Sequence, residues 1–436
     1  MNELIGQFPA DWELLKLPEV LFFQEGPGIT SDKFTKEGIP FINIRCFVNG
    51  RIDRGSCQFI SQKLGNGEYR HFQLAVNDWV FSSSGTIGKI AFIFDEDLPL
   101  LLNTSTIRFR TKDEKRLANN YIKFFLESFH FKIQHQLQTQ GSAQVNVGPT
   151  HLQKMHIPLP PIKEQAKIAE VLSTVDKAIS ETEALIAKQQ RIKTGLMQDL
   201  LTRGIDENGN LRSEETHQFK DSPLGRIPIE WETISMEKIT TKIVDGIHHK
   251  PNYVQQGIPF IVVTDLTSSE GINFNPSRFI TEKDHQEFYK RADPKPKDVL
   301  VTKDGTLGIA RIVPDEAPDF SIFVSVAMLR PNSSKCIPEL IWSFFESGRF
   351  LTQLGSLSAG TGLAHIHLEH FRRFQIHWMP VDEQKKIFDV LNKQHFLLQK
   401  QCQDLEKLKQ LKTGLMQDLL TGKKRVTPLL ENSPIS

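Results

Sequence analysis

Apolar and polar residues alternate in two different rhythms along this chain, and each rhythm occurs twice. Around residues 10–157 and 229–376, short apolar runs rich in Phe and β-branched residues lie between Gly-containing turns. This pattern predicts strands in a globular, strand-rich region. The predicted strand segments are FINIRCF, DWVFSSSGTIGKIAFIF and LLNTSTIRFR in the first region and IPFIVVTDL, DVLVTKDGTLGIARIV and FVSVAMLR in the second. A short amphipathic helix is predicted in each region, at YIKFFLES and LIWSFFES.

The second rhythm has steps of three, four and seven residues and predicts one long helix after each region. The helices are expected over about 162–203 and 381–421, after the proline-containing starts IPLPPIKEQ and HWMPVDEQ. Each would be a rod of about 60 Å at about 1.5 Å per residue. Two such rods are expected to pack as a coiled coil, with core helices of a larger α domain as the alternative. The apolar positions expected in the seam are Ile168, Leu172, Val175, Ile179, Ile186, Ile192, Leu196 and Leu200, and Ile387, Leu391, Leu398, Leu405, Leu408, Leu411, Leu415 and Leu419.

The two halves are copies of one unit, because a shift of 219 residues carries the first onto the second. KTGLMQDLLT at 193–202 recurs at 412–421, and GIPFI at 38–42 recurs at 257–261. Between these anchors the copies differ strongly. Two copies that share anchor segments but differ in the sequence between them suggest a protein that performs one operation on two different targets. Gly195 and Gly414 should each cost about 1 kcal/mol inside a helix, so a close helix crossing or a partner on the backbone is expected there.

Composition narrows the class of protein. A hydrophobic content of 39 % and a charged content of 24 % are ordinary for a soluble globular protein. No apolar run approaches the roughly 18 residues that suggest a membrane span. The net charge of +1 means that any nucleic-acid binding rests on local patches or on partners. The four cysteines lack CxxC spacing, so free thiols in a reducing cytoplasm are expected at Cys46, Cys57, Cys336 and Cys402.

These features together resemble the specificity (S) subunit of type I restriction-modification enzymes. The resemblance covers about residues 5–422 and rests on two near-identical helices that open with Glu-Gln and end with K-x-G-L-M-Q-x-L-L. It implies an α+β fold with two strand-rich target-recognition domains and two long helices packed as an antiparallel coiled coil, in a pseudo-twofold repeat. The implied parts are recognition domains at 1–157 and 229–376, helical arms at 158–205 and 377–422, a linker at 206–228 and a basic, then flexible tail at 423–436.

The resemblance also implies a function without catalysis in this chain. Each recognition domain would read one half of an asymmetric, bipartite site in double-stranded DNA. The coiled coil would set the gap between the halves and dock two methyltransferase subunits, and restriction/translocase subunits would complete a cytoplasmic, prokaryotic complex away from any membrane. No cofactor is expected on this chain, whereas S-adenosylmethionine, ATP and Mg are expected in the partners. The sequence agrees, since it has no P-loop and no Asn/Asp-Pro-Pro-Tyr/Phe motif.

Three loops have the character that DNA contact requires, because base edges and phosphates are bound by hydrogen-bonding or cationic side chains. The first is SSSGTIGK with its counterpart TKDGTLG, which resembles the family's G-T-I-G turn; a plain hairpin turn is the alternative. The second is QTQGSAQVNVGPTH with its counterpart SAGTGLAHIHLEH, where a polar linker is the alternative, and the third is DGIHHK. The predicted DNA-binding residues are Ser82, Ser83, Ser84, Thr86, Lys89, Gln140, Ser142, Gln144, Asn146, His248, His249, Lys250, Thr302, Lys303, Asp304, Thr306, Thr361, His365 and His367.

The identical segments 193–202 and 412–421 are the predicted partner surface, because packing alone would tolerate exchanges among Leu, Met and Ile. A recent duplication of this segment alone is the other explanation. The candidate partner-binding residues are Lys193, Gly195, Met197, Gln198, Lys412, Gly414, Met416 and Gln417. The basic stretch 423–425 suits either DNA or partner contact or a solvated tail.

A metal site is not expected in this chain, whereas two alternative functions remain open. His365, His367 and His370 are not expected to bind a metal, because no cysteine or carboxylate pattern completes a site. The alternative functions are the specificity subunit of a related system that cuts on both sides of its site, and a coiled-coil assembly scaffold without DNA binding.

Overall fold

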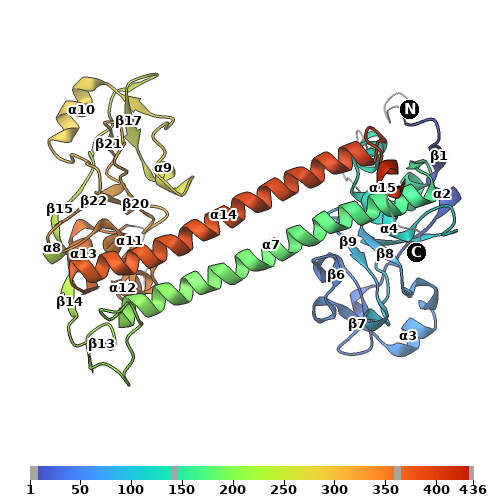
Figure 1. Ribbon diagram of the computed structural model, residues 1–436, viewed down its shortest axis with the longest axis horizontal. Coiled ribbons are helices and arrows are strands. Elements are labelled where there is room, and N and C mark those ends of the chain that lie inside the picture. The colour runs from blue at the N-terminus through green and yellow to red at the C-terminus, as the bar shows by residue number, and fades with distance from the viewer. Residues whose placement is uncertain (1–7, 140–145, 358–364, 432–436) are drawn as a thin grey trace. The chain divides into compact units, whose positions relative to one another are not determined.

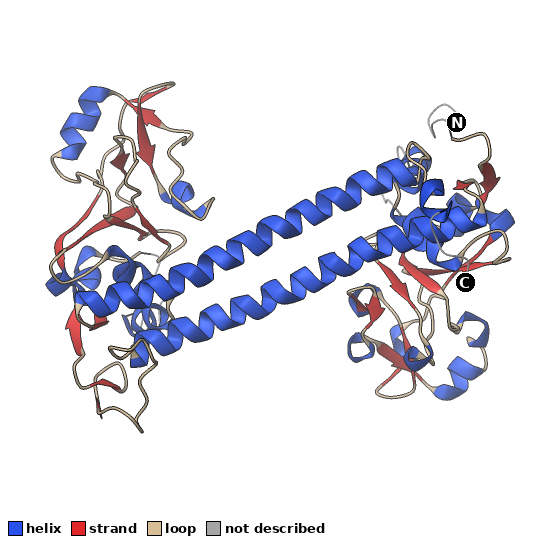
Figure 2. Cartoon of the chain, viewed as in Figure 1, coloured by secondary structure: helices blue, strands red, loops and turns tan. Residues whose placement is uncertain are grey.

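The computed structural model describes residues 8–139, 146–357 and 365–431 (Figure 1). The chain forms two compact units: unit 1 comprises residues 1–186 and 400–436, and unit 2 comprises residues 187–399. Each unit combines one globular region with part of each of two long helices. Both units mix helices and strands, which Figure 2 distinguishes by colour.

Unit 1 contains one larger sheet and three small ones. Its helices and strands are β1 (Glu13–Lys16), α2 (Leu17–Val20), β2 (Leu21–Glu25), β3 (Phe34–Thr35), β4 (Ile39–Phe41), β5 (Phe47–Val48), β6 (Arg51–Ile52), β7 (Gln58–Ile60), α3 (Gln62–Asn66), β8 (Trp79–Ser82), β9 (Ile90–Phe92), β10 (Thr106–Thr111), α4 (Asn119–Glu127), α5 (Phe129–Thr139), α6 (Pro149–Leu152), β11 (His156–Leu159) and α15 (Thr427–Glu431). The larger sheet has the strand order β2-β10-β8-β9, and the small sheets are β1-β11, β3-β7-β4 and β5-β6.

Unit 2 repeats this plan with different outer strands. Its helices and strands are β12 (Phe219–Lys220), β13 (Ile227–Pro228), β14 (Glu232–Ser235), α8 (Met236–Ile239), β15 (Thr240–Asp245), β16 (Tyr253–Val254), β17 (Ile258–Ile261), α9 (Val263–Thr267), β18 (Phe279–Ile280), α10 (Glu282–Tyr289), β19 (Val299–Thr302), β20 (Ala310–Ile312), β21 (Ser321–Ile322), β22 (Val326–Pro331), α11 (Pro338–Glu346), α12 (Gly348–Leu357), α13 (Leu368–Arg373) and β23 (Gln375–Trp378). The order β15-β22-β19-β20 matches β2-β10-β8-β9 of unit 1, and β14-β23 matches β1-β11.

One ion pair, in which the carboxylate is buried and the arginine is partly exposed, recurs at the same place in both main sheets. In unit 1, Arg110 on β10 donates from Nε and Nη2 to the Asp78 carboxylate just before β8, at 2.6 and 2.9 Å. In unit 2, Arg330 on β22 binds Asp298 before β19 in the same way, at 2.9 and 2.8 Å. Two parallel hydrogen bonds fix both the separation and the angle of the groups they join. The pair therefore holds the central strand of each sheet to the start of its neighbour.

Two predicted strand segments bend into helical turns partway along. FINIRCF has only Phe41 in β4 and only Phe47 in β5, with a single turn at Ile44–Cys46 between them, and IPFIVVTDL forms β17 and then α9. In the first, the Asn43 side chain accepts a hydrogen bond from the Arg45 N–H, and in the second, Asp265 accepts one from the Val262 N–H. The strand prediction was wrong for the turn at Ile44–Cys46 and for α9, because a capping side chain satisfies the backbone locally and favours a turn over a ladder. The two predicted amphipathic helices are confirmed as α4 and α11.

The two long helices are α7 (Ile162–Arg203), which covers the predicted range, and α14 (Val381–Leu419), which ends two residues early. In unit 1, Glu183 of α7 pairs with Lys409 of α14 at 3.1 Å. In unit 2, Gln394 of α14 donates to Gln189 of α7 at 2.7 Å. The helices therefore lie side by side within each unit.

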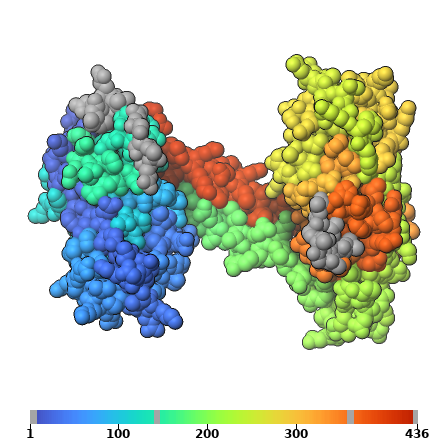
Figure 3. All heavy atoms as spheres, turned by 180° about the vertical axis from the view of Figure 1, so that it is seen from behind, coloured from blue at the N-terminus to red at the C-terminus, as the bar shows by residue number. Residues whose placement is uncertain are grey.

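Not every predicted seam residue is covered. Ile192 and Leu411, expected in the seam, are 38 % and 51 % exposed, while Leu391 and Leu398 are buried. A pair of helices can cover only a narrow stripe of each, so an extra apolar position falls outside it. The outer surfaces of α7 in green and α14 in red can be followed in the space-filling view (Figure 3).

The ends of the long helices belong to the cores of the globular regions. In unit 1, Leu172 of α7 and Leu419 of α14 pack in one apolar cluster with Phe81 and Phe109 of the sheet. In unit 2, the corresponding cluster joins Leu200 of α7, residues of α14 and the sheet. Each globular region thus needs both helix ends to complete its core.

A buried glutamate at the start of each long helix ties it to the end of the other. In unit 2, Glu383 accepts hydrogen bonds from Arg212, from Trp231 Nε1 at 3.1 Å and from the Ile205 N–H at 3.1 Å. Arg212 and Ile205 lie in the segment that follows α7. Gly204 has φ +64°, and a Cβ there would lie 2.3 Å from Glu383 Oε1. The segment leaving α7 therefore passes directly over the first turn of α14.

Unit 1 has the same kind of contact between the other two helix ends. We call this contact the clasp: a buried glutamate at the start of one long helix is bound by an arginine that follows the other. Arg425, beyond the end of α14, donates to the Glu164 carboxylate at 2.7 and 2.6 Å and to Asp11 at 3.0 and 2.7 Å. Glu164 is 1 % exposed. The basic stretch 423–425 thus has a third role that was not predicted, because its arginine neutralises a buried carboxylate. Residues beyond it form α15, and those from 432 lie outside the described residues.

The clasp predicts unequal costs for two arginine substitutions in unit 2. Arg212→Met leaves the Glu383 carboxylate buried without its cation, so we expect a loss of roughly 3 to 5 kcal/mol in the free energy of unfolding. Arg226→Met is the matched control, since its pairs with Glu214 and Asp221 are exposed, and we expect a loss of at most about 1 kcal/mol. Urea denaturation of both variants tests this, and equal losses would contradict it.

Candidate nucleic-acid interface

The G-T-I-G turn of unit 1 connects β8 to β9 and divides its residues into buried and exposed ones. Ser82 Oγ donates to the Thr86 carbonyl at 2.7 Å and accepts from the Lys89 N–H at 2.8 Å. Ser83 is fully buried, and its backbone carbonyl accepts from the Val147 N–H at 2.9 Å. Ser82 and Ser83 therefore shape the turn. Of the predicted residues here, Thr86 and Lys89 are exposed and Ser84 is half-buried, so these three can reach a ligand.

The counterpart turn of unit 2 between β19 and β20 has the same division. Thr302 is buried and its Oγ1 accepts from the Ile309 N–H at 2.9 Å. Lys303 is buried, and its carbonyl accepts from the Ile366 N–H at 2.9 Å, as that of Ser83 does from Val147. Asp304 is half-buried and Thr306 is exposed. The same backbone conformation thus presents Asp304 where unit 1 has Ser84, and a threonine in both units.

A cluster of charges, which we call the charge cluster, joins Asp245, Arg291 and Lys303 in unit 2. Lys303 Nζ lies 3.1 Å from Asp245 Oδ2, and Arg291 Nη2 donates to Asp245 Oδ1. His248 Nε2 lies 3.2 Å from the same Asp245 oxygen. Burial by itself would raise the pKa of Asp245, but hydrogen bonds from Arg291, His248 and Lys303 outweigh it and lower that pKa. Asp245 is therefore held ionised by the side chains of Arg291 and Lys303 on its two sides.

Further contacts draw all three predicted loops of unit 2 into one place. Lys303 Nζ lies 3.2 Å from His365 Nε2, and His365 Nδ1 is hydrogen-bonded to Asp304. A backbone bridge also joins Asp304 to His365. Gly246, which follows Asp245, has room only for hydrogen, because a Cβ would lie 1.9 Å from the Ile322 carbonyl oxygen. The DGIHHK and TKDGTLG segments and His365 thus meet at one surface, which the sequence alone did not indicate.

The other predicted residues have varied placements. His248, His249, Lys250 and His367 are exposed beside the charge cluster or its loops, and Asn146 is half-buried with its carbonyl 3.4 Å from His135 Nε2. Gln140, Ser142, Gln144 and Thr361 lie outside the described residues. Lys303 is 2 % exposed, so its ammonium contacts a ligand only after leaving Asp245. Among the described residues there is no group of three or more potential metal ligands.

Sequence reasoning missed Arg291, which belongs to no motif. It follows α10 and reaches the end of β15 through the fold, so no local pattern marks it. The only sequence signal is weak: Arg291 lies two residues after Tyr289, as the basic residue His71 lies two residues after Tyr69 in the first copy.

The predicted partner surface has the same exposure in both copies. Thr194, Gly195 and Gln198 are exposed like Thr413, Gly414 and Gln417, while the following leucines are buried in both. A Cβ on Gly195 or Gly414 would meet no atom of the described residues within 4 Å. The expected close helix crossing at these glycines was therefore wrong, and their backbone is open to an external partner. Met197 and Met416 are half-buried.

The two predicted lysines are engaged within the chain. Lys193 Nζ lies 3.3 Å from His395 Nδ1, and Lys412 Nζ lies 2.7 Å from both Glu127 and Asp176. Burial alone would lower the pKa of Lys412, but the two carboxylates outweigh it and raise that pKa. The lysines therefore bind other residues of this chain, and the groups of the predicted partner surface that remain open to a partner are the threonines, glycines and glutamines.

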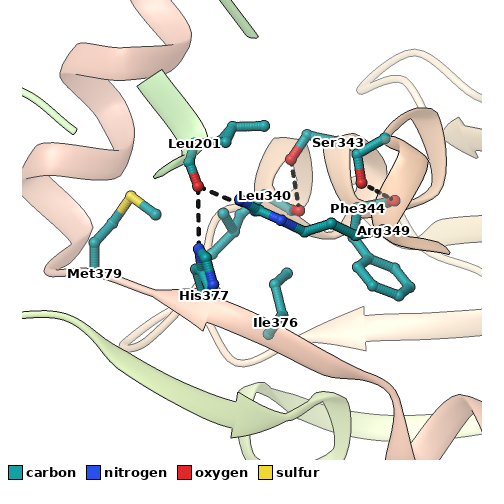
Figure 4. Close-up of a pocket in the computed structure, with 9 residues that line it drawn as sticks. Leu201, Leu340, Ser343, Phe344, Arg349, Ile376, His377 and Met379 are labelled. Atoms are coloured by element: carbon teal, nitrogen blue, oxygen red, sulfur yellow. Dashed lines mark hydrogen bonds between the residues drawn. The ribbon is translucent and has the colours of Figure 1, made fainter. Parts of the chain in front are cut away.

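In unit 2, the identical segment forms one wall of a groove of about 470 Å³. Thr194, Met197 and Gln198 of α7 face Gly348 and Thr352 of α12 across it. Beneath the groove, the Leu201 carbonyl accepts from Arg349 Nη1 at 3.0 Å and contacts His377 Nδ1 at 3.2 Å (Figure 4). The carbonyls of the last helical turn lack helical partners, so these two side chains cap the end of α7.

The fold and its loops define a duplicated recognition protein, in which two sheets of the same order present polar loops of different composition. The family described as "Type I restriction modification DNA specificity domain" matches residues 9–193 and again residues 228–416. The chain belongs to this family, and its role is sequence specificity toward DNA. No helix in the described part of the chain is long and apolar enough to cross a membrane.

Relatives cover nearly the whole chain at low identity. The type I restriction enzyme MjaVIII specificity subunit of Methanocaldococcus jannaschii is 22 % identical over 97 % of this chain and 95 % of its own length. The EcoBI specificity subunit of Escherichia coli is 24 % identical over 86 % and 77 %. In fold, a chain from work on the assembly of the type I R-M system matches with a TM-score of 0.60 and 18 % identity, covering 96 % of this chain and 100 % of that one. The S subunit from M. genitalium matches with a TM-score of 0.55 and 14 % identity, covering 95 % and 98 %.

The capped end of α7 predicts a loss of stability in acid. Burial, with the nearby Arg349 charge, lowers the pKa of His377 from 6.5 to about 4. Above pH 6.5 the imidazole is neutral in both folded and unfolded chains; as the pH falls from 6.5 to about 4, only the unfolded chain takes up the proton. The folded state should lose about 3 kcal/mol across this window, since each pKa unit corresponds to about 1.4 kcal/mol.

The measurement is the urea unfolding free energy of wild type and His377→Gln from pH 7.5 to 4. Glutamine keeps a donor for the Leu201 carbonyl and does not titrate, so the variant should show a shallower decline. His217→Gln, outside this pocket, is the control and should keep the wild-type slope. Parallel curves for wild type and His377→Gln would contradict the assignment.

Proposed function

We propose that the two globular regions are target-recognition domains that each read one half of an asymmetric, bipartite DNA site. The observation that carries this proposal is the pair of turns at 82–89 and 302–308. Their buried residues make the same backbone hydrogen bonds and both turns expose a threonine, whereas Ser84 and Lys89 of unit 1 are replaced by Asp304 and Ile309 in unit 2. A constant frame with variable exposed groups suits the reading of two different base sequences by one geometry.

The long helices are proposed to form an antiparallel coiled coil that sets the gap between the half-sites. Contacts within each unit support this. In unit 1, Asp176 pairs with Lys412 and the later residue Glu183 pairs with the earlier residue Lys409. The opposite order along the two helices is that of antiparallel neighbours. The repeated strand order and the two clasps support a pseudo-twofold arrangement, which would present two readers to DNA in like geometry.

Two methyltransferase subunits are the proposed partners of the two identical segments, since equal surfaces bind equal partners. The matching exposure of 193–202 and 412–421 supports this. In this proposal the chain itself is not catalytic and binds no cofactor, and S-adenosylmethionine, ATP and Mg act in the methyltransferase and restriction subunits.

A domain exchange tests the division of labour. Replacing residues 10–155 with the equivalent domain of another specificity subunit should change one half of the methylated motif and leave the other half and the gap unchanged. The readout is methylome sequencing of a host that expresses the chain with its methyltransferase. The reciprocal control is exchange of residues 229–376, which should change only the other half. A change in both halves after one exchange would refute the proposal, and a chain that directs no sequence-specific methylation would favour an assembly scaffold.

A pair of glycine substitutions tests the partner surface. Gly195→Leu with Gly414→Leu meets open space, so helix stability should rise by up to about 1 kcal/mol per site. Methyltransferase binding should nevertheless be lost, because the leucines cover backbone that the partner must approach. Each single variant should lose one of two partner copies, measured by native mass spectrometry. Ala187→Leu, at an exposed position of α7 outside the identical segment, is the control and should keep both partner copies. Binding of two partner copies by the double variant would contradict the proposed partner surface.

A further inference from the structure

Arg291 occupies an unusual position among the exposed arginines of unit 2, because one edge of its guanidinium is fixed by the end of β15. Its Nε donates to the carbonyl oxygens of Asp245 at 3.1 Å and Gly246 at 3.0 Å, and its Nη2 donates to the Asp245 carboxylate. The side chain is 44 % exposed. Its Nη1 has no hydrogen-bond partner among the described residues. The guanidinium is thus rigid on one edge and open on the other.

The buried neighbour Lys303 leaves the positive charge of Arg291 available to a ligand. Lys303 already supplies one positive charge to Asp245 at 3.1 Å, in a position where it is buried. The Asp245 carboxylate is therefore neutralised from inside the domain, and Arg291 adds a positive charge at the surface. A side chain already fixed in one conformation loses less conformational entropy on binding than a free one.

The surroundings of Arg291 are those of the proposed DNA-reading surface. His248 Nε2 lies 3.0 Å from its Nη2, and Asp245 links it through Lys303 to His365 and Asp304. Arg291 is therefore joined to all three loops that sequence reasoning singled out in this unit. The first copy has His71 at the corresponding place, exposed and with its ring against Phe72.

The first copy also lacks the charges that hold such an arginine. Glu25 ends β2 as Asp245 ends β15, but Glu25 makes no ion pair among the described residues. Burial raises the pKa of Glu25, with no cation to oppose it. Ser83 stands where unit 2 has Lys303. Among the described residues, an exposed arginine fixed in this way is therefore found in unit 2 and not at the corresponding place in unit 1.

We propose that Arg291 is a specificity-determining residue of unit 2 that reads a guanine in its DNA half-site, with Asp245 and Lys303 as positioning residues. Arginine is suited to guanine because its planar donors match the O6 and N7 acceptors in the major groove. This inference rests on the proposed function of the two units. A phosphate contact or a purely structural role for Arg291 would leave base preference unchanged, and this difference separates them from the proposal.

The experiment uses the full chain with its methyltransferase partner. Methylome sequencing first gives the motif, and exchange of residues 229–376 shows which half belongs to unit 2. Arg291→Lys keeps the charge but removes the planar pair of donors, so one guanine of that half should become degenerate and the other half should stay unchanged. Arg278→Lys, at an exposed arginine of the same unit, is the control and should keep the whole motif.

A second measurement does not depend on the folding of a variant. Duplexes with 7-deazaguanine, which lacks the N7 acceptor, at single positions of the unit 2 half-site are titrated against the wild-type complex. One position should lose roughly 10- to 100-fold in affinity, and Arg291→Lys should show no further loss at that position. A half-site without a sensitive guanine, or an intact motif in Arg291→Lys, would overturn the inference while the proposed function stands. Absence of any bipartite motif in the wild type would overturn both.

Discussion

The buried carboxylates Glu164 and Glu383 are the groups on which the rest of the structure depends. Each lies in the first turn of a long helix and is covered by residues that follow the other long helix. A buried carboxylate is strongly unfavourable without a cation, so the first turn of one helix is stable only where the end of the other delivers an arginine. The adjacent glutamines, Gln165 and Gln384, each accept from one backbone N–H and donate to two carbonyls beside it. The Glu-Gln step therefore joins the helix ends to the globular region.

This constraint explains why the two copies keep some residues and vary others. The glutamates at the helix starts and the Asp–Arg pair of the main sheet are shared, because each satisfies a buried polar group. The two turns share their backbone hydrogen bonds, although their buried side chains differ. Flanking positions of the same turns are under no such constraint and differ between the copies, as Ser84 and Asp304 do. A recognition protein with two targets needs this separation, since base preference can then change without loss of the fold.

The charge cluster of unit 2 shows how far this divergence extends inward. Lys303 occupies a buried place that a serine fills in unit 1, and it is tolerated because Asp245 lies 3.1 Å away. The pair holds three loops together and leaves Arg291 and the histidines at the surface. Fixing polar side chains before a ligand arrives reduces the entropy that binding costs. The interior of a recognition domain thus takes part in setting what its surface can read.

The sequence by itself determined the duplication, the long helices, the amphipathic helices at YIKFFLES and LIWSFFES and the loops that carry polar side chains. These features depend on local periodicity, prolines and glycines. Each of these signals acts over a few residues, so it can be recognised from the sequence without the structure. Only the tertiary structure decided which loop residues are buried, that three loops of unit 2 meet, and that Arg212, Arg291 and Arg425 join segments far apart in the chain. The expected strands after Phe41 and Ile261 failed because a capping side chain nearby in sequence favours a turn, and the expected crossing at Gly195 and Gly414 failed because no side chain of the described residues approaches them. Burial and ion pairing are set by neighbours distant in sequence, and a single sequence does not state which neighbours those are.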